Sequence, residues 1–145
     1  MSKFNFKSQP CTSREQSKRL LALGIKKETA DCGHFYGRIE HEEYEDWETI
    51  ILDDYGWESH WDVTDEDIPA WSLYRLTEMM PMTMEDRICH ELWDLNITPE
   101  LVIYRNQQEP SEYIEQFSGQ GVYNNIIDCI ECLIKEGYFN EEYLG

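Results

Sequence analysis

The pattern that most constrains the fold is an apolar stripe in residues 121–139, "GVYNNIIDCIECLIKEGYF". Apolar side chains recur there every three or four residues, as on the buried face of an amphipathic helix. Gly137 follows the stripe, where a glycine commonly ends a helix. The sequence therefore predicts a C-terminal helix that needs a hydrophobic surface to pack against. The stripe comprises Val122, Ile126, Cys129, Ile130 and Leu133, and is widened by Ile127 and Ile134.

Residues 92–104 have the alternating pattern of a strand. Trp93, Leu95 and Ile97 alternate with polar residues, so we expect these three side chains to face inward. A tight connection at 98–100 should lead into a second strand, and "EYIEQF" (112–117) should supply a third after a proline. A further strand is expected at 46–52, in "WETIIL", before the turn signal "DDYG".

Two more helices are predicted toward the N-terminus. In residues 12–24, Thr12 and Glu15 have capping-box spacing and Gly24 ends the apolar run. Residues 65–81, "DEDIPAWSLYRLTEMMP", read as a helix with Asp65 or Asp67 as its cap. In that helix Pro69 would sit in the first turn and Pro81 would close it, while Ile68, Trp71, Leu76, Met79 and Met80 would fall near one face. A short helical turn is expected within 26–33, ending at Gly33.

Together these patterns predict an α+β fold, with a small antiparallel sheet of three to four strands and helices packed on one face. A chain of 145 residues with 41% hydrophobic residues fits one domain, residues 1–145. Residues 1–11 read as an extended arm, because Pro10 disfavours helix in the residue before it.

The cysteines and the apolar runs indicate a reduced compartment. Five cysteines, an odd number, argue against a complete disulfide framework. The N-terminus lacks an apolar leader, and no apolar run approaches the roughly 20 residues that span a bilayer. We therefore expect a cytoplasmic protein without membrane contact.

The net charge of −18 is unevenly distributed. Residues 1–30 hold seven basic and two acidic residues, whereas residues 31–145 hold five basic and 28 acidic residues. Such a body repels nucleic acid and anionic membranes and attracts basic proteins. We interpret the basic N-terminal segment as packing against the acidic body rather than as contacting phosphate. A partner protein with a basic surface is predicted, and direct nucleic-acid binding is not.

The acid is most concentrated in residues 41–67, which contain twelve carboxylates, three tryptophans and no lysine or arginine. Two interpretations fit. If the aromatic rings are exposed, they would anchor a surface that mimics nucleic acid. If the rings are core, the acids are a solubilising surface, which the rarity of exposed aromatic patches favours. The candidate interaction surface consists of Glu42, Glu43, Tyr44, Glu45, Asp46, Asp53, Asp54, Tyr55, Trp57, Glu58 and Trp61.

No motif assigns a catalytic residue, a cofactor site or a metal site. Cys129 and Cys132 form a C-x-x-C pattern inside the helical stripe, where Cys129 is expected to be a small buried hydrophobe. Cys32 with His34 and Cys89 with His90 are four soft ligand types, but their spacing does not require a common metal. The acidic stretch lacks the spaced ligands of an EF-hand loop. A metal-dependent enzyme that uses the clustered carboxylates of residues 40–67 remains the alternative function.

Three segments resemble small acidic proteins carried by phages and mobile elements of Bacteroidetes gut bacteria. These are "EQSKRLLALGIKKETAD", "DEDIPAWSLYRLTEMMP" and "NNIIDCIECLIKEGYF", which occur in this order and span most of the chain. The central "IPAWSLYRLTEMMP" is the most distinctive, and the other two are generic amphipathic helices. The resemblance implies no activity and no functional residues. It favours a non-enzymatic factor that binds host proteins, an argument by association.

Overall fold

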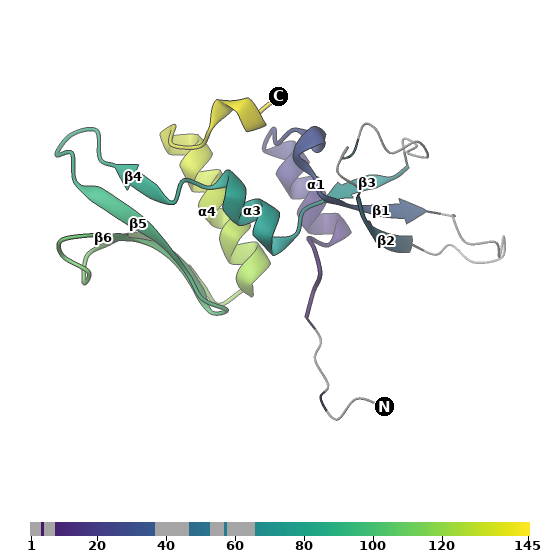
Figure 1. Cartoon of the computed structure of the whole chain (residues 1–145), viewed down its shortest axis with the longest axis horizontal. Helices are drawn as coiled ribbons and strands as arrows, with labels where there is room; N and C mark the ends of the chain where they lie inside the picture. Colours follow the sequence, from purple (N-terminus) through teal and green to yellow (C-terminus); the bar gives the residue numbers. More distant parts are fainter. Residues whose placement is uncertain (1–3, 5–7, 37–46, 53–56, 58–65) are drawn as a thin grey trace.

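Two small antiparallel sheets flank a central group of helices in the computed structural model (Figure 1). The structure describes residues 4, 8–36, 47–52, 57 and 66–145. The described helices are α1 (Arg14–Ala22), α3 (Leu73–Met79) and α4 (Val122–Glu136), with single 3₁₀ turns at Lys27–Thr29 and Glu141–Tyr143. The described strands are β1 (Cys32–Tyr36), β2 (Trp47–Ile51), β3 (Ile68–Ala70), β4 (Thr83–Glu85), β5 (Leu92–Ile97), β6 (Leu101–Asn106) and β7 (Tyr113–Ser118).

The larger sheet has the order β4-β5-β6-β7, and α4 packs on one of its faces. Trp93, Leu95 and Ile97 face this interface, as their alternation predicts. The apolar stripe of α4 lies opposite them, and Gly137 ends the helix with a left-handed backbone at φ 76°. The C-terminal helix, the β5–β6 hairpin and the third strand β7 are therefore confirmed.

The smaller sheet has the order β2-β1-β3 and lies on the other side of the helices (Figure 1). The α+β class with a small antiparallel sheet is confirmed, but the sequence did not predict that the strands divide into two sheets. Strand β1 was not predicted because its first four residues, Cys32 to Phe35, are all buried, so no polar alternation marks it. Strand β4 has three residues, too few to establish a period.

Helix α1 begins one residue later than its predicted cap implies. Ser13 is the N-cap, and its side chain accepts from Gln16 N while the Gln16 side chain accepts from Ser13 N. The predicted box of Thr12 and Glu15 is wrong, because the Thr12 hydroxyl is fully buried and accepts a hydrogen bond from Trp71 N.

The predicted helix at 65–81 is wrong in its first half. Residues Ile68–Ala70 form β3, and the helix begins only after Ser72, whose hydroxyl accepts from Arg75 N. Asp67 is not the helix cap, since it is buried and accepts a hydrogen bond from Tyr36 N of β1. Pro69 is tolerated because β3 is an edge strand. Trp71, Leu76, Met79 and Met80 are nevertheless buried in the core.

The segment 26–33 makes its helical turn at Lys27–Thr29 but does not end at Gly33, which lies inside β1. Strand β2 occupies the predicted place, yet it is not a core strand. It is the edge of its sheet, and Ile51 is 79% exposed. Only Leu52, directly after the strand, is buried, with Ile50 packed beside it.

Candidate functional site

Trp57 belongs to the candidate interaction surface, and the structure places it in a small core. Its side chain is 4% exposed and stacks on Phe35, with ring centroids 5.7 Å apart. A Cβ at Gly33 would come within 2.7 Å of both rings, so the glycine makes room for the stack. Trp57 is therefore unsuitable as an exposed anchor for a partner. The other ten residues of that surface lie outside the described residues, so the structure does not bring them together or separate them.

Strand β2 is the longest described part of the acidic stretch. Glu48 and Thr49 are exposed, and within the described residues β2 pairs only with β1. Trp47 is half-buried, and the Arg14 guanidinium lies 4.5 Å from the centroid of its ring. Basic α1 and the acidic stretch are thus in contact at this point.

The arginines in the described part of the chain make contacts within the protein. Arg19 pairs with Asp128 and with Glu131 of α4, the latter at 3.0 Å. This contact fits the interpretation that the basic N-terminal segment packs against the acidic body. The others contact aromatic rings, carbonyls or one carboxylate: Arg14 on Trp47, Arg75 on Glu78 and the Thr29 carbonyl, Arg87 on Tyr138 and the Gly137 carbonyl, and Arg105 on the Pro110 carbonyl.

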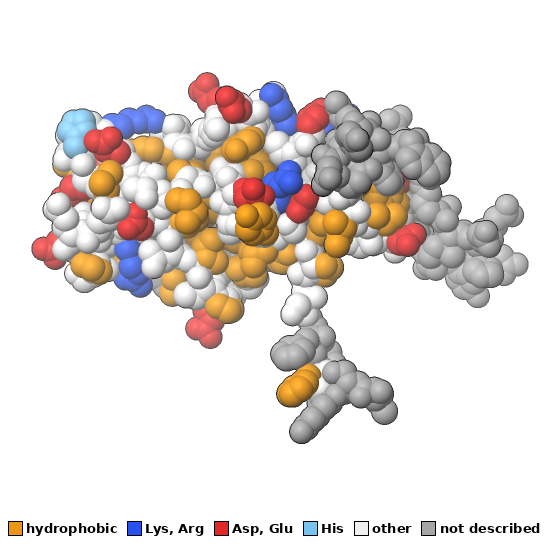
Figure 2. All heavy atoms as spheres, in the orientation of Figure 1, with side chains coloured by type: hydrophobic (Ala, Val, Ile, Leu, Met, Phe, Trp, Pro, Cys, Tyr) orange, Lys and Arg blue, Asp and Glu red, His pale blue; other side chains and the backbone are white. Residues whose placement is uncertain are grey.

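Acidic side chains are spread over the face that Figure 2 shows and are not gathered into one patch among the coloured residues. With 30 acidic and 12 basic residues, internal pairing leaves a large excess of negative charge.

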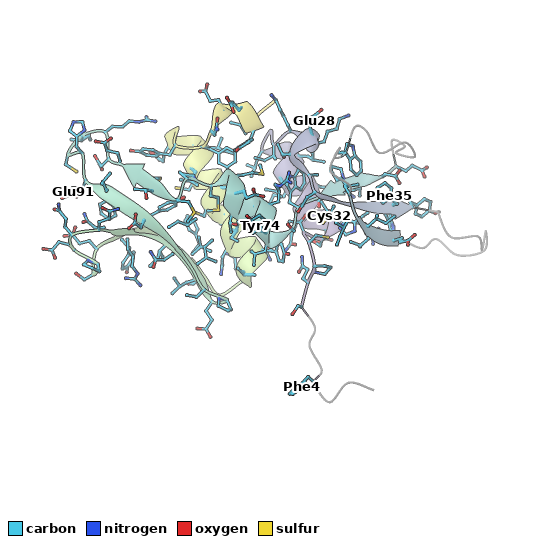
Figure 3. The ribbon with its side chains drawn as sticks, in the orientation of Figure 1. Phe4, Glu28, Cys32, Phe35, Tyr74 and Glu91 are labelled. Atoms are coloured by element: carbon cyan, nitrogen blue, oxygen red, sulfur yellow. The ribbon has the colours of Figure 1, made fainter. Side chains whose placement is uncertain are left out.

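Among the described residues, a buried pair of thiols forms a group of reactive side chains that the sequence patterns did not single out. Cys11 precedes α1 and Cys32 begins β1, and the side chains are 2% and 3% exposed. They pack together with Ala70 of β3. In Figure 3, Cys32 lies at the end of β1 that is next to the helices, and Phe35 lies toward the outer end of the same strand.

His34 lies beside this pair because Cys32 and His34, two residues apart in a strand, share one face. The Nε2 atom is 2.7 Å from the Thr12 carbonyl oxygen and 4.0 Å from Cys11 Sγ. A carbonyl only accepts, so Nε2 must carry a hydrogen. The Nδ1 atom is 2.9 Å from Thr49 Oγ1 of β2. Both ring nitrogens of His34 therefore have protein partners.

The contact between the thiols shifts their pKa values in opposite directions. The Cys32 thiol donates to Cys11 and, with the help of the His34 imidazole, holds the pKa of Cys11 well below its usual value, although burial opposes this. The same contact, reinforced by burial, raises the pKa of Cys32. Contact with Cys11 also raises the pKa of His34 against the effect of desolvation. The arrangement favours a thiolate on Cys11 that is stabilised by a neighbouring thiol and an imidazole.

The spacing of Cys32 and His34 was a usable signal, because it predicts a shared face if the segment is a strand. Cys11 had no such signal, since its place depends on how the N-terminal segment crosses the sheet. The four soft ligand types are not brought together: Cys89 and His90 are exposed at the β4–β5 turn of the other sheet. No group of three or more histidine, cysteine, aspartate or glutamate side chains within the described ranges is placed to hold a metal ion.

Cys129 is buried on the apolar face of α4, as its place in the stripe predicts, and Cys132 is half-buried one turn later. An open cleft of about 600 Å³ lies between residues 8–10 and the first turns of α3 and α4. Its lining includes Gln9, Tyr74 and Asn124 and contains no charged side chain.

Comparison with known proteins gives no relative from which the role of this fold or site could be inferred. No family model matches the chain, and neither the curated proteins nor the solved structures contain a match. None of the described helices is both long enough and apolar enough to pass through a membrane. The fold and the site define an acidic α+β protein with a buried thiol pair.

Proposed function

We propose that this protein acts without catalysis, by binding a protein partner that has a basic surface. The observation that carries the proposal is the imbalance of charge. Of 42 charged residues, 30 are acidic, and the described arginines contact other groups of the same chain. The excess negative charge is therefore available for long-range attraction of a cationic surface.

The proposed contact region is the acidic stretch, residues 41–67. Its described strand, β2, is at the edge of its sheet within the described residues, with Glu48, Thr49 and Ile51 exposed. Exposed edges are common sites for the addition of a partner strand, and carboxylates beside such an edge would select a basic partner. Mimicry of nucleic acid is a special case of this proposal and depends on the carboxylates outside the described residues. The proposal includes a cytoplasmic location, which the odd number of cysteines favours. It also includes a role for a phage or mobile element, which depends on the resemblance of three segments.

The experiment uses the immobilised full chain in a lysate of a Bacteroidetes bacterium at 50 and 500 mM NaCl. Proteins that are retained only at low salt are purified, and their affinity is measured by calorimetry at both salt concentrations. A basic partner should bind with 1:1 stoichiometry, and its affinity should fall steeply between the two concentrations because exposed charges are screened.

A pair of double variants tests where the partner binds. Glu48→Gln with Glu66→Gln removes two exposed charges from the acidic stretch, and Glu141→Gln with Glu142→Gln removes two exposed charges near the C-terminus. We expect the first variant to weaken binding about fivefold and the second to change it less than twofold. Equal losses would mean that only net charge matters, and the absence of saturable binding at 50 mM NaCl would refute the proposal itself.

A further inference from the structure

Cys11 and Cys32 differ from an ordinary pair of buried cysteines in their surroundings. Cys129 lies on the apolar face of α4 among the isoleucines and leucines of the main core. The Cys11 and Cys32 side chains instead form a separate small cluster and contact each other. Cys11 Sγ also lies 4.0 Å from His34 Nε2. Simple packing requires neither the contact between the two thiols nor the imidazole.

We infer that Cys11 and Cys32 are a redox-active dithiol, which a hydroperoxide oxidises to an intramolecular disulfide while His34 keeps Cys11 as the attacking thiolate. The Nε2–H of His34 donates to the Thr12 carbonyl, and Cys11 Sγ lies 4.0 Å from the same nitrogen, so the ring places partial positive charge near the sulfur. Thr49 fixes the other side of the ring at 2.9 Å. A thiolate held by a histidine is the reactive form of cysteine.

The first step consumes the oxidant. The Cys11 sulfur attacks one oxygen of hydrogen peroxide, so that an S–O bond forms and the O–O bond breaks. The leaving hydroxide takes up a proton to give water, and Cys11 becomes a sulfenic acid. Peroxide is close to water in size, and Cys11 directly follows the exposed residues 8–10, which border the cleft.

The second step uses the neighbouring thiol. The Cys32 sulfur attacks Cys11 Sγ, an S–S bond forms, the S–O bond breaks, and the hydroxide leaves with the proton of Cys32 as water. Two thiols have then lost two electrons and two protons, and one peroxide has become two waters. Because the thiols already touch, the second step needs only a local movement of the side chains.

The disulfide would join the segment before α1 to the first residue of β1 and enclose α1 in a covalent loop. Closing a loop of this length limits the unfolded chain, so oxidation should raise the melting temperature by roughly 5–10 °C. Oxidation would also remove the charge of Cys11 beside His34, whose ring contacts β2 in the acidic stretch.

The test treats the reduced full chain with hydrogen peroxide at pH 7, alkylates the remaining thiols after denaturation, and maps tryptic peptides by mass spectrometry. Cleavage should place Cys11 in peptide 8–14 and Cys32 in peptide 28–38. We expect these two peptides to become disulfide-linked at least about ten times faster than exposed Cys89 is oxidised. Cys11 and Cys32 that stay reduced while Cys89 reacts, or that pair with other cysteines, would overturn the inference.

Variants separate the two steps. In Cys32→Ser the oxidation should stop at a sulfenic acid on Cys11, which dimedone traps, and peroxide should no longer raise the melting temperature. His34→Gln should slow the first step about tenfold, while Cys89→Ser, the matched control, should leave it unchanged. Equal rates in His34→Gln and wild type would remove the role of the histidine. The peptide map of the wild-type chain decides the inference even if a variant fails to fold.

Discussion

Thr12 shows how much of the fold depends on one buried polar residue. Its side chain is fully buried, and its oxygen accepts a hydrogen bond from Trp71 N at 3.0 Å and lies 2.8 Å from Ser17 Oγ. Its backbone N–H donates to the Trp71 carbonyl, and its carbonyl accepts from His34 Nε2. One residue therefore joins the start of α1 to both β1 and the segment after β3.

The variant Thr12→Val keeps the shape of the side chain and removes its oxygen. The Trp71 N–H and the Ser17 hydroxyl would then be buried without that partner, so we expect a loss of about 2 kcal/mol in the free energy of unfolding. Urea denaturation measures the loss. Thr77→Val is the control, because the Thr77 hydroxyl bonds a carbonyl of its own helix at the surface, and it should cost less than about 0.5 kcal/mol. Similar costs for both variants would contradict the proposed role of Thr12.

The sequence predicted whether a single side chain is buried only where a helical or strand period placed that residue on the covered face. The burial of Cys129 and the inward position of Trp93 followed from the helical and strand periods. The contact of Cys11 with Cys32 and His34 has no local signal, since the two segments are separated by all of α1. Tertiary packing alone brings these side chains together, and the sequence therefore did not predict the thiol pair.

The sequence predicted the helices and strands that have one covered and one exposed face, and it did not predict a strand that is covered on both faces. Helix α4 and the β5–β6 hairpin each have a covered and an open face, so their periods are visible in the sequence. Strand β1 is covered on both faces, by Cys11 on one and by Trp57 on the other, and its pattern is lost. The start of α3 depends on a distant residue, because the Asp31 carboxylate accepts from both the N–H and the hydroxyl of Ser72.

The N-terminus of α1 gives a prediction that distinguishes the observed cap from the expected one. Ser13→Ala removes the side-chain oxygen that accepts from Gln16 N, and should cost about 1 kcal/mol in the free energy of unfolding. Glu15→Ala serves as the control, because Glu15 is an exposed first-turn residue outside the observed capping box, and should cost less than about 0.5 kcal/mol. Urea denaturation of both variants gives the comparison, and a larger loss for Glu15→Ala than for Ser13→Ala would contradict the observed cap.

For the whole molecule, the net charge of −18 sets two opposing effects of salt on stability. Salt screens the repulsion among 30 carboxylates, which stabilises the fold, and it screens ion pairs such as Arg19 with Asp128, which destabilises it. Repulsion should dominate, because 12 basic residues can neutralise less than half of the acid. We expect the melting temperature to rise by about 3–6 °C between 10 and 300 mM NaCl.

Two variants with the same change of charge test which effect dominates locally. Arg19→Gln removes the cation between α1 and the carboxylates of α4, whereas Lys18→Gln removes an exposed charge for which the described residues supply no ion pair. At 10 mM NaCl, Arg19→Gln should be less stable than Lys18→Gln by about 1 kcal/mol, a value reduced for the partial exposure of the pair. The difference should shrink at 300 mM NaCl, because salt screens the carboxylates that Arg19 had neutralised. A difference between the two variants that does not depend on salt would mean that Arg19 acts through packing. A melting temperature of the wild-type chain that falls with salt would mean that attraction outweighs repulsion even in so acidic a chain.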